Sequence, residues 1–546
     1  MRLDGNSTQV LFLLMKKYSI IHIIGIVALI LTCIPIIYLL LQAFRPTETV
    51  LSNQLLIAYI RNTIIMILVV GFSAGFLGLT LAWIISFYDF PFRRFFKVVL
   101  ALPLAIPPYI AAVSYSDFMY VNGLFPRLLG TFGITKHFDI MNIHGAIFIY
   151  SITLYPYVYI ACLSFFKYTS ASFVENARVL KANWVKLFSK VGVPLARLPL
   201  VAGLTLVIME LVSDFGVIDY YGVQGFSTGI YKIWHNYSDF YGAIRLSAIL
   251  LCIIFAVVYI ESFLRRRLRY FTTSKSKSIK LIRVKNARYL LIYFTLTLII
   301  TFIIPLIQLV YNGIYAYEKI WNIKLLQVTL NTVYYTSIAS FICVGISFVI
   351  ANYVKGKKGI FAKTISKLAT MGYSIPGVLV GLSVMFTFFD VDKLLVPLYR
   401  FIGIKQKVLV LSTSVFVFMF AYVVRFMAVS FNNINAGYKK INPNLFRASA
   451  TLKQSTSQTF WRVDFPLMLP TLLMSFLLVF LEILKELPIT LMLKPYKLET
   501  LTGFVHTYTH NEQYSEASIY SLVIILLGII TVSLIMLFRE KKYVKS

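Results

Sequence analysis

Charged residues are scarce in this sequence, and acidic residues are scarcest. Only 13% of its 546 residues are charged, and 52 Lys and Arg stand against 21 Asp and Glu. Soluble globular domains carry about 25% charged residues, so this composition excludes an ordinary soluble protein. The hydrophobic fraction of 59% and the mean hydropathy of +0.80 agree with that exclusion. We therefore expect a polytopic membrane protein.

Cysteine is also scarce, and a nucleotide-binding motif is lacking. The four cysteines fall within apolar runs without C-x-x-C spacing, so we expect neither a disulfide framework nor a metal site from them. The phosphate-binding pattern G-x-x-x-x-G-K-[ST] does not occur, because VKGKKGI at 354–360 fails the spacing. The chain is thus expected to be no ATPase and to bind no cofactor itself. No cleavable signal peptide is evident, and the first apolar run is long enough to remain as an anchor.

Long apolar runs recur along the whole chain. A helix of about twenty apolar residues crosses roughly 30 Å of hydrocarbon. These runs predict an all-α polytopic membrane protein of about twelve transmembrane helices. Their approximate positions are 20–43, 62–88, 96–120, 144–167, 199–219, 243–262, 289–312, 329–353, 368–389, 408–430, 469–492 and 517–538.

Positive charge is concentrated in alternate loops. The net charge of +31 could suggest nucleic acid, but its distribution favours membrane topology and attraction to anionic lipid. By the positive-inside rule these loops are cytoplasmic, which predicts that both termini of this multi-pass membrane protein are cytoplasmic too. The basic clusters are Lys16–Lys17, Arg93–Lys97, Lys181–Lys190, Arg265–Arg267, Lys355–Lys367, Lys439–Arg462 and Arg539–Lys542.

The chain repeats itself across a basic segment. Identical or similar residues recur at a nearly constant separation of about 270 residues, with small insertions accounting for the drift. We predict a first half at 1–264, a basic cytoplasmic linker at 265–288 and a second half at 289–546, with six spans in each half. An even number of spans gives both halves the same orientation, so this is a parallel repeat with a pathway expected between the halves. The matching pairs are Asn62/Asn331, Thr63/Thr332, Phe92/Phe361, Ile106/Ile375, Pro107/Pro376, Pro194/Pro466, Glu210/Glu482, Asp214/Glu486, Gly229/Gly503, Ala243/Ala517 and Ser247/Ser521.

Each half has a long cytoplasmic loop between its fourth and fifth spans. These loops, at about 170–197 and 436–468, carry apolar residues at helical spacing with basic residues between them. One such loop could be an interfacial helix that only anchors in lipid headgroups. The same loop at the same point of both halves instead favours paired docking surfaces for a two-fold partner.

The sequences of these loops resemble the EAA loops of ABC importer permeases. The stretches ENARVLKAN…FSKVGVPL and RASATLKQS…FWRVDFPL carry the likeness. The resemblance implies a protein of the bacterial inner membrane with the type I ABC importer permease fold. It also implies coupling helices that contact a separate ATPase subunit, present in two copies, which uses ATP and Mg²⁺. This chain departs from the pattern because Lys181 and Lys453 replace the usual Gly, and Arg447 replaces the glutamate. The implied ATPase-coupling residues are Glu175, Ala177, Leu180, Lys181, Trp184, Pro194, Arg447, Ser449, Leu452, Lys453 and Pro466.

A wider likeness covers nearly the whole chain. The stretches ELVSDFGVIDYYGVQGFSTGIYKIW and LEILKELPITLMLKPYKLETL resemble spans of fused permeases that import ferric iron from an extracytoplasmic binding protein. The resemblance implies ferric iron as substrate and such a binding protein as partner. Thiamine, sulfate and aminoethylphosphonate permeases are related, so another small solute remains an alternative. A secondary transporter and a non-transporting scaffold or sensor are rival interpretations that the paired loops disfavour.

Several acids interrupt apolar runs, which is costly unless they face a partner, an aqueous path or the bundle interior. Three interpretations are open: they fix helix packing, they present oxygen ligands to a passing cation, or they lie at a hydrated mouth of the path. The translocation-path candidates are Glu210, Asp214, Asp219, Tyr220, Tyr221, Glu482 and Glu486.

Histidines near the predicted outer loops could touch a metal ion transiently. His506 and His510 have the i,i+4 spacing of one helix face, and His235 lies in the corresponding region of the first half. Nothing nearby in the sequence completes a metal-binding motif, so surface histidines are the favoured interpretation. A conduit must also release its substrate, and no stable metal site is therefore predicted.

Overall fold

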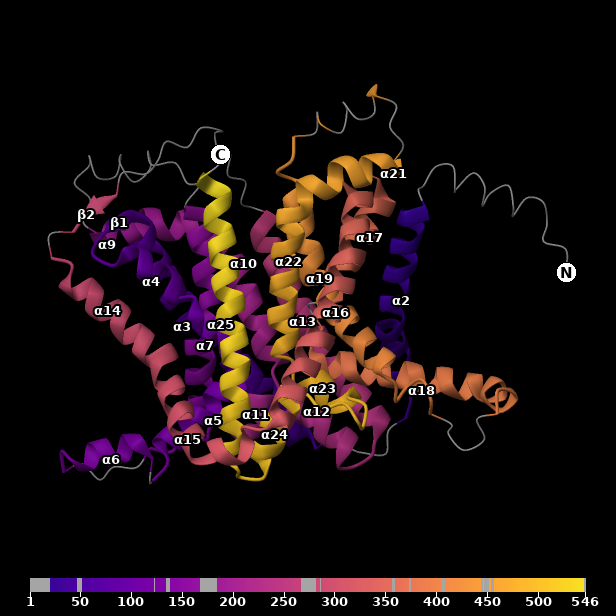
Figure 1. The fold of residues 1–546 in the computed structure, drawn as a ribbon, viewed down its shortest axis with the longest axis horizontal. Coiled ribbons are helices and arrows are strands. Elements are labelled where there is room, and N and C mark those ends of the chain that lie inside the picture. The colour runs from indigo at the N-terminus through magenta and orange to yellow at the C-terminus, as the bar shows by residue number, and fades with distance from the viewer. Residues whose placement is uncertain are drawn as a thin grey trace. The chain divides into compact units, whose positions relative to one another are not determined.

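The computed structural model is α-helical apart from two very short strands in the part of the chain that it describes (Figure 1). It separates into two compact units, one of residues 1–42, 330–499 and 537–546 (unit 1) and one of residues 43–329 and 500–536 (unit 2). The described residues are 20–46, 52–121, 123–133, 138–166, 184–266, 281–284, 286–355, 359–372, 375–403, 409–442, 445, 451–452 and 456–544.

Unit 2 contains most of the first predicted half. Its two strands pair in parallel, Tyr88 with Ile282 and Asp89 with Arg283. The helices α4 and α9 and both strands lie at one end of this unit, and α11, α12 and α24 lie at the other (Figure 1). Its elements are α3 (Asn53–Phe87), β1 (Tyr88–Asp89), α4 (Arg93–Val99), a 3₁₀ turn (Leu102–Ala105), α5 (Pro108–Met119), α6 (Leu124–Gly130), α7 (Ile143–Phe166), α9 (Trp184–Leu187), α10 (Val193–Ser213), α11 (Gly216–Tyr220), α12 (Phe226–His235), α13 (Phe240–Arg266), β2 (Ile282–Arg283), α14 (Arg288–Leu298), α15 (Ile304–Ile320), α24 (Leu501–His510) and most of α25 (Tyr514–Val544).

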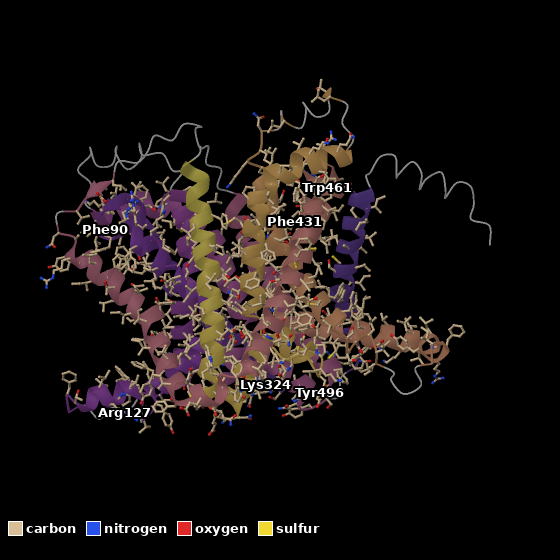
Figure 2. All side chains as sticks on the ribbon, viewed as in Figure 1. Phe90, Arg127, Lys324, Phe431, Trp461 and Tyr496 are labelled. Atoms are coloured by element: carbon tan, nitrogen blue, oxygen red, sulfur yellow. The ribbon has the colours of Figure 1, made fainter. Side chains whose placement is uncertain are left out.

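Unit 1 contains the middle of the second predicted half. Its core includes Phe431 of α19, which Figure 2 labels and which is fully buried, together with Phe348, Phe460 and Met468. Its elements are α2 (Ile20–Gln42), most of α16 (Ile323–Val354), α17 (Ile360–Met371), α18 (Gly377–Phe401), α19 (Val415–Tyr438), α21 (Thr456–Thr459), α22 (Phe465–Leu484) and α23 (Pro488–Leu493).

The first helix of each predicted half packs in the unit that is built mainly from the other half. Helix α2 belongs to unit 1, where the Tyr38 hydroxyl donates a hydrogen bond to Asp390 of α18. Helix α15 belongs to unit 2, where Ser114 Oγ of α5 donates to the Pro305 carbonyl at 3.0 Å. The compact units therefore exchange helices relative to the sequence halves, and the boundaries 1–264, 265–288 and 289–546 stay a prediction about sequence repeats.

Among the described residues, ten helices are long and apolar enough to cross a membrane, or eleven if one bent pair counts as a single span. The bent pair joins residues 93–105 to residues 108–130 at 92° and covers the predicted span 96–120. In the described part of the chain, no helix that is long and apolar enough to cross a membrane covers the predicted span 368–389, where α17 and α18 form separate helices. The expectation of continuous helices at these two places was wrong, although ten of the twelve predicted spans have a helix.

The repeated Ile-Pro pair explains both interruptions. Pro107 precedes α5 and Pro376 precedes α18, each with extended backbone. Proline has no N–H to donate and disfavours helical backbone at the residue before it, so a helix does not continue through Ile106 or Ile375. An apolar run thus gives the right composition for a span but not its continuity.

Close packing of α3 against α7 depends on a glycine. A Cβ atom on Gly78 would lie 2.8 Å from the Tyr155 carbonyl oxygen and 2.9 Å from the Tyr159 amide nitrogen. These are backbone atoms that a rotamer change cannot move. On the same helix, a Cβ on Gly71 would meet nothing within 4 Å.

We predict that Gly78→Ala lowers the thermal unfolding midpoint of the detergent-purified chain by several degrees, because overpacking costs about 1–3 kcal/mol. The matched control Gly71→Ala should leave the midpoint unchanged or raise it slightly, because alanine favours a helix by up to about 1 kcal/mol over glycine. Tryptophan fluorescence during heating measures both. Equal midpoints for the two variants would contradict the close approach of α3 and α7.

Candidate functional site

The two predicted coupling loops are described only at their C-terminal ends. Glu175, Ala177, Leu180 and Lys181 of the first loop, and Arg447, Ser449 and Lys453 of the second, lie outside the described residues. Trp184 begins α9, and Leu452 is exposed. The assignment of these residues to ATPase coupling stays a prediction.

Where description resumes, both loops enter the membrane in the same way. A π-helical turn, Phe188–Gly192 in one half and Phe460–Asp464 in the other, leads directly into α10 or α22. The exposed Pro194 and Pro466 follow at the helix start. A proline ring clashes with the carbonyl four residues earlier, and widening the turn relieves that clash. The repeated proline of the sequence thus marks a repeated irregular turn.

Asp214 joins two helices of unit 2. Its amide donates to the Glu210 carbonyl at 2.9 Å and so ends α10. Its Oδ2 accepts hydrogen bonds from the Val217 amide at 2.9 Å and from the Tyr150 hydroxyl at 2.7 Å. The carboxylate therefore satisfies an amide at the start of α11 that has no partner within the helix.

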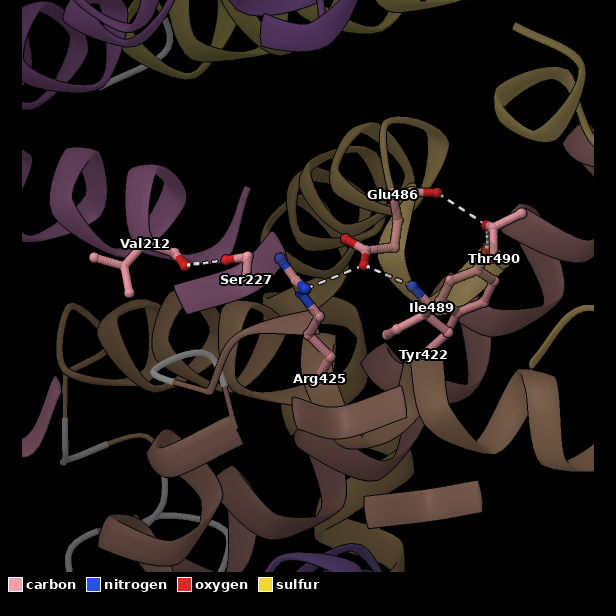
Figure 3. A network of polar contacts seen from close by, with 7 residues as sticks. All are labelled: Val212, Ser227, Tyr422, Arg425, Glu486, Ile489 and Thr490. Carbon is pink, nitrogen blue, oxygen red and sulfur yellow. Dashed lines mark hydrogen bonds and ion pairs between the residues drawn. The ribbon is translucent and has the colours of Figure 1, made fainter. Parts of the chain in front are cut away.

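Glu486 has the corresponding role in unit 1. Its Oε1 accepts hydrogen bonds from the Ile489 amide at 3.3 Å and from Arg425 Nη1 at 3.1 Å, as Figure 3 shows. Its carbonyl accepts from Thr490 Oγ1 at 2.9 Å, and the same hydroxyl bonds to Tyr422. Figure 3 also draws Ser227 of unit 2, whose hydroxyl donates to the Val212 carbonyl at 3.1 Å.

The two halves thus have equivalent acids where α10 or α22 ends and the next short helix begins, but these acids have different partners. We call these two positions the helix breaks. Tyr150 and Tyr422 are related by the same sequence separation as Asp214 and Glu486. In unit 2 the tyrosine bonds to the acid directly, whereas in unit 1 Arg425 does so. Both side chains of the Arg425–Glu486 pair are less than a tenth exposed. These contacts are those of the packing interpretation.

The earlier acid of each pair lies one helical turn away. Glu482 is buried and forms an ion pair with Lys485 at 3.1 Å. Glu210 is half-buried. Arg425 had not been expected as a partner, because a single arginine in an apolar run gives no sign of which acid it will meet. The sequence did indicate that Arg425 needs a partner of some kind, because an isolated charge in a span is costly.

Asp219, Tyr220 and Tyr221 lie on or directly after α11. The Tyr221 hydroxyl donates to the Ala112 carbonyl at 3.1 Å and is buried, so this residue is part of the packing of α5. Tyr220 is half-buried beside Tyr221. Asp219 instead reaches α24, where its Oδ2 lies 3.2 Å from His510 Nε2. Of the three, only Asp219 joins a group of possible metal ligands.

The structure brings Asp219, His506 and His510 together, and we name them the Asp-His-His cluster. One ligand atom from each lies within 4.8 Å of the others. Burial lowers the pKa of His506 to about 4, with His510 contributing, so this imidazole is neutral near pH 7. The hydrogen bond that His510 donates to the Asp219 carboxylate raises the pKa of His510. The favoured prediction of surface histidines is therefore wrong for His506, whose Nε2 atom is buried.

His235 does not join this cluster. It is exposed at the end of α12 and stacks on Tyr231 with ring centroids 5.3 Å apart. Tyr231 in turn contacts the buried ring of Phe215, and Phe215 lies against His506. An aromatic layer thus lies between His235 and the cluster.

A further acid that sequence reasoning missed is Asp117 of α5. Its Oδ2 accepts hydrogen bonds from the Gln308 and Asn312 side-chain amides of α15, the latter at 2.6 Å. Gln308 and Asn312 are one helical turn apart inside an apolar run, and that spacing was the available signal. These bonds attach α15 to the unit in which it packs.

A polytopic α-helical chain in which the same interrupted helices, the same irregular turns and the same capped breaks occur twice is a membrane transport protein of duplicated design. The chain belongs to the family of binding-protein-dependent transport system inner membrane components, whose pattern matches residues 74–270 and again residues 342–541. The two matches confirm that the long repeat seen in the sequence is a duplicated permease region in a multi-pass inner-membrane protein.

The relatives include permeases named for ferric iron and permeases named for sulfate. The Fe(3+)-transport system permease protein FbpB 2 of Haemophilus influenzae is 22% identical over 525 residues, which cover 94% of this chain and 96% of the relative. The ferric transport system permease protein FbpB of Actinobacillus pleuropneumoniae is 21% identical over 522 residues, which cover 90% of this chain and 73% of the relative. The sulfate transport system permease protein CysT of Salmonella typhimurium is 27% identical over 169 residues, which cover 31% of this chain and 60% of the relative.

We predict that Arg425→Gln and Glu486→Gln each destabilise the chain strongly, since removing one partner of a buried pair costs roughly 3–5 kcal/mol. The double variant should lose clearly less than the sum of the two, because neither charge is then left unpaired. Thermal unfolding midpoints in detergent measure this.

The exposed pair Lys393–Asp390 provides the control for this comparison. Lys393→Gln should shift the midpoint very little, because its side chain is 70% exposed and surface pairs contribute about 0–1 kcal/mol. Additive losses in the Arg425/Glu486 cycle would show that the two side chains do not interact.

Proposed function

We propose that this chain forms both transmembrane halves of an ATP-driven importer of ferric iron. The observation that carries the proposal is the similarity to a permease named for Fe(3+) transport, which runs through both halves and covers nearly the whole of each chain. A second permease named for ferric transport also matches through both halves. Import of sulfate is the second candidate, because sulfate permeases match part of the chain at slightly higher identity.

In this proposal, the partners act from opposite sides of the membrane. The basic clusters support cytoplasmic loops and cytoplasmic termini. Two copies of a separate ATPase bind the coupling loops there and use ATP and Mg²⁺. An extracytoplasmic binding protein delivers the substrate to the other side, where α11, α12 and α24 of unit 2 lie, away from the basic helix α4 (Figure 1).

The mechanism we infer is alternating access. ATP binding draws the two coupling loops together, and the loops act on α10 and α22 through the π-helical turns before Pro194 and Pro466. The far ends of these helices are the breaks that Asp214 and Glu486 cap. Each ligand drives the cycle only through its unequal affinity for the inward-open and outward-open states.

Because of its hydrogen bonds, Asp214 is better suited than Glu486 to testing whether an acid in the path contacts the substrate. Asparagine at this position keeps an oxygen that can accept from Val217 and Tyr150, and it removes the charge. Glu486→Gln instead leaves the buried Arg425 without its anionic partner. Loss of transport in that variant would not separate a path role from a stability role.

We predict that proteoliposomes with the full chain, its ATPase and its binding protein take up radiolabelled ferric iron in an ATP-dependent manner. Asp214→Asn should reduce the uptake rate about tenfold while ATPase stimulation by the loaded binding protein persists, if the carboxylate meets the cation. The exposed acid Glu512 offers a matched control, and Glu512→Gln should transport as the wild type does.

Other results would decide between the rivals. ATPase stimulation by a sulfate-loaded binding protein, without iron uptake, would replace ferric iron by sulfate. Uptake that continues without the ATPase would favour a secondary transporter. Unchanged uptake in Asp214→Asn would assign this acid to helix capping alone.

A further inference from the structure

The Asp-His-His cluster is built from segments that lie far apart in the sequence. Asp219 is on α11 in the first predicted half, and both histidines are on α24 in the second. His506 and His510 are four residues apart, so they share one face of α24, and their ring centroids are 4.2 Å apart. All three residues belong to unit 2, and the cluster therefore lies within one compact part of the chain.

The spacing of the three side chains suits one metal ion. Two ligand atoms on a tetrahedral zinc ion are about 3.4 Å apart, given bonds of about 2.0–2.1 Å. Asp219 Oδ2 and His510 Nε2 are already 3.2 Å apart, and the three ligand atoms lie within 4.8 Å of one another. Small side-chain rotations would bring the third atom to a bonding distance.

An unsatisfied nitrogen gives independent support. The Nε2 atom of His506 is buried and has no hydrogen-bond partner among the described residues. Leaving a buried polar atom unpaired costs free energy. A metal ion that accepts the lone pair of this nitrogen would remove that cost.

We propose that Asp219, His506 and His510 form a binding site for a divalent transition-metal ion such as Zn²⁺ or Fe²⁺. Imidazole and carboxylate groups are common ligands of such ions. Two histidines at i,i+4 on one helix supply two of the ligands in many zinc sites. Three protein ligands leave a further coordination position to water or another small ligand. These ligands offer one oxygen donor and two nitrogen donors. A hard trivalent cation is instead expected to take mostly oxygen donors.

The site would join a helix of the first predicted half to a helix of the second. A bound ion would hold α11 and α24 at their present separation and oppose any step of the transport cycle that parts them. This inference does not rest on the cargo, because it concerns binding of a divalent ion to the chain alone.

The test is metal binding by the full chain in lipid nanodiscs after chelator treatment. We expect one Zn²⁺ per chain in competition with a fluorescent chelator, and visible absorption bands typical of four or five ligands when Co²⁺ is added. Asp219→Asn, His506→Gln and His510→Gln should each weaken binding at least tenfold and abolish the cobalt bands. The exposed residues His144 and His235 provide controls, and His144→Gln and His235→Gln should bind as the wild type does.

The partly buried His506 is the residue whose substitution is most able to disturb folding, so each variant is first compared with wild type by size-exclusion elution and thermal midpoint. If His506→Gln fails this comparison, the exposed His510 decides the outcome through His510→Gln. Equal Zn²⁺ affinity in wild type and His510→Gln, or a cobalt spectrum of the hydrated ion only, would overturn the proposal. Failure of iron uptake with intact Zn²⁺ binding would overturn the proposed function and leave this site standing.

Discussion

A peptide group without a hydrogen-bond partner is too costly to leave in the hydrocarbon of a bilayer, and this constraint governs four interruptions of the helices in the described part of the chain. The interruptions at Ile106-Pro107 and Ile375-Pro376 use a residue that has no N–H to satisfy. Those after α10 and α22 use Asp214 and Glu486, whose carboxylates accept an amide of the next short helix. These four interruptions thus follow from two local solutions, each used twice.

The same constraint explains why acids appear in apolar runs without implying that they meet a substrate. Asp214, Asp117 and Glu486 each bind donors on a neighbouring helix. An acid in this position ties its own helix to the neighbour that supplies the donor. Packing and transport are compatible roles. A carboxylate that binds a protein donor in one state and a passing cation in another can serve both.

The sequence was most informative where a signal is local or repeated. Apolar length predicted most spans, and the recurrence of Pro194 as Pro466 predicted that both halves contain the same unit, which the family match confirmed. It was least informative about continuity and partners. The apolar run at 368–389 contains Pro376 and does not form one helix.

The sequence did not predict contacts between distant segments. Asp219 meets His510 only because α24 packs in the unit of the first half, and no spacing in the sequence encodes that neighbour. The packing of α2 with α18 in unit 1, and of α15 with α5 in unit 2, has the same origin. The residues of the candidate sites could be picked out from the sequence, but their grouping could not.

The exchange of first helices also has a consequence for synthesis. Tyr38 of α2 and its partner Asp390 are 352 residues apart. At about 5–20 residues per second, roughly 20 to 70 s pass between the emergence of the two from the ribosome. During that time α2 must persist in lipid as a single helix, and its sequence contains no Asp, Glu, Lys or Arg that would make this costly. The composition of α2 is therefore suited to waiting in the bilayer as well as to the final packing.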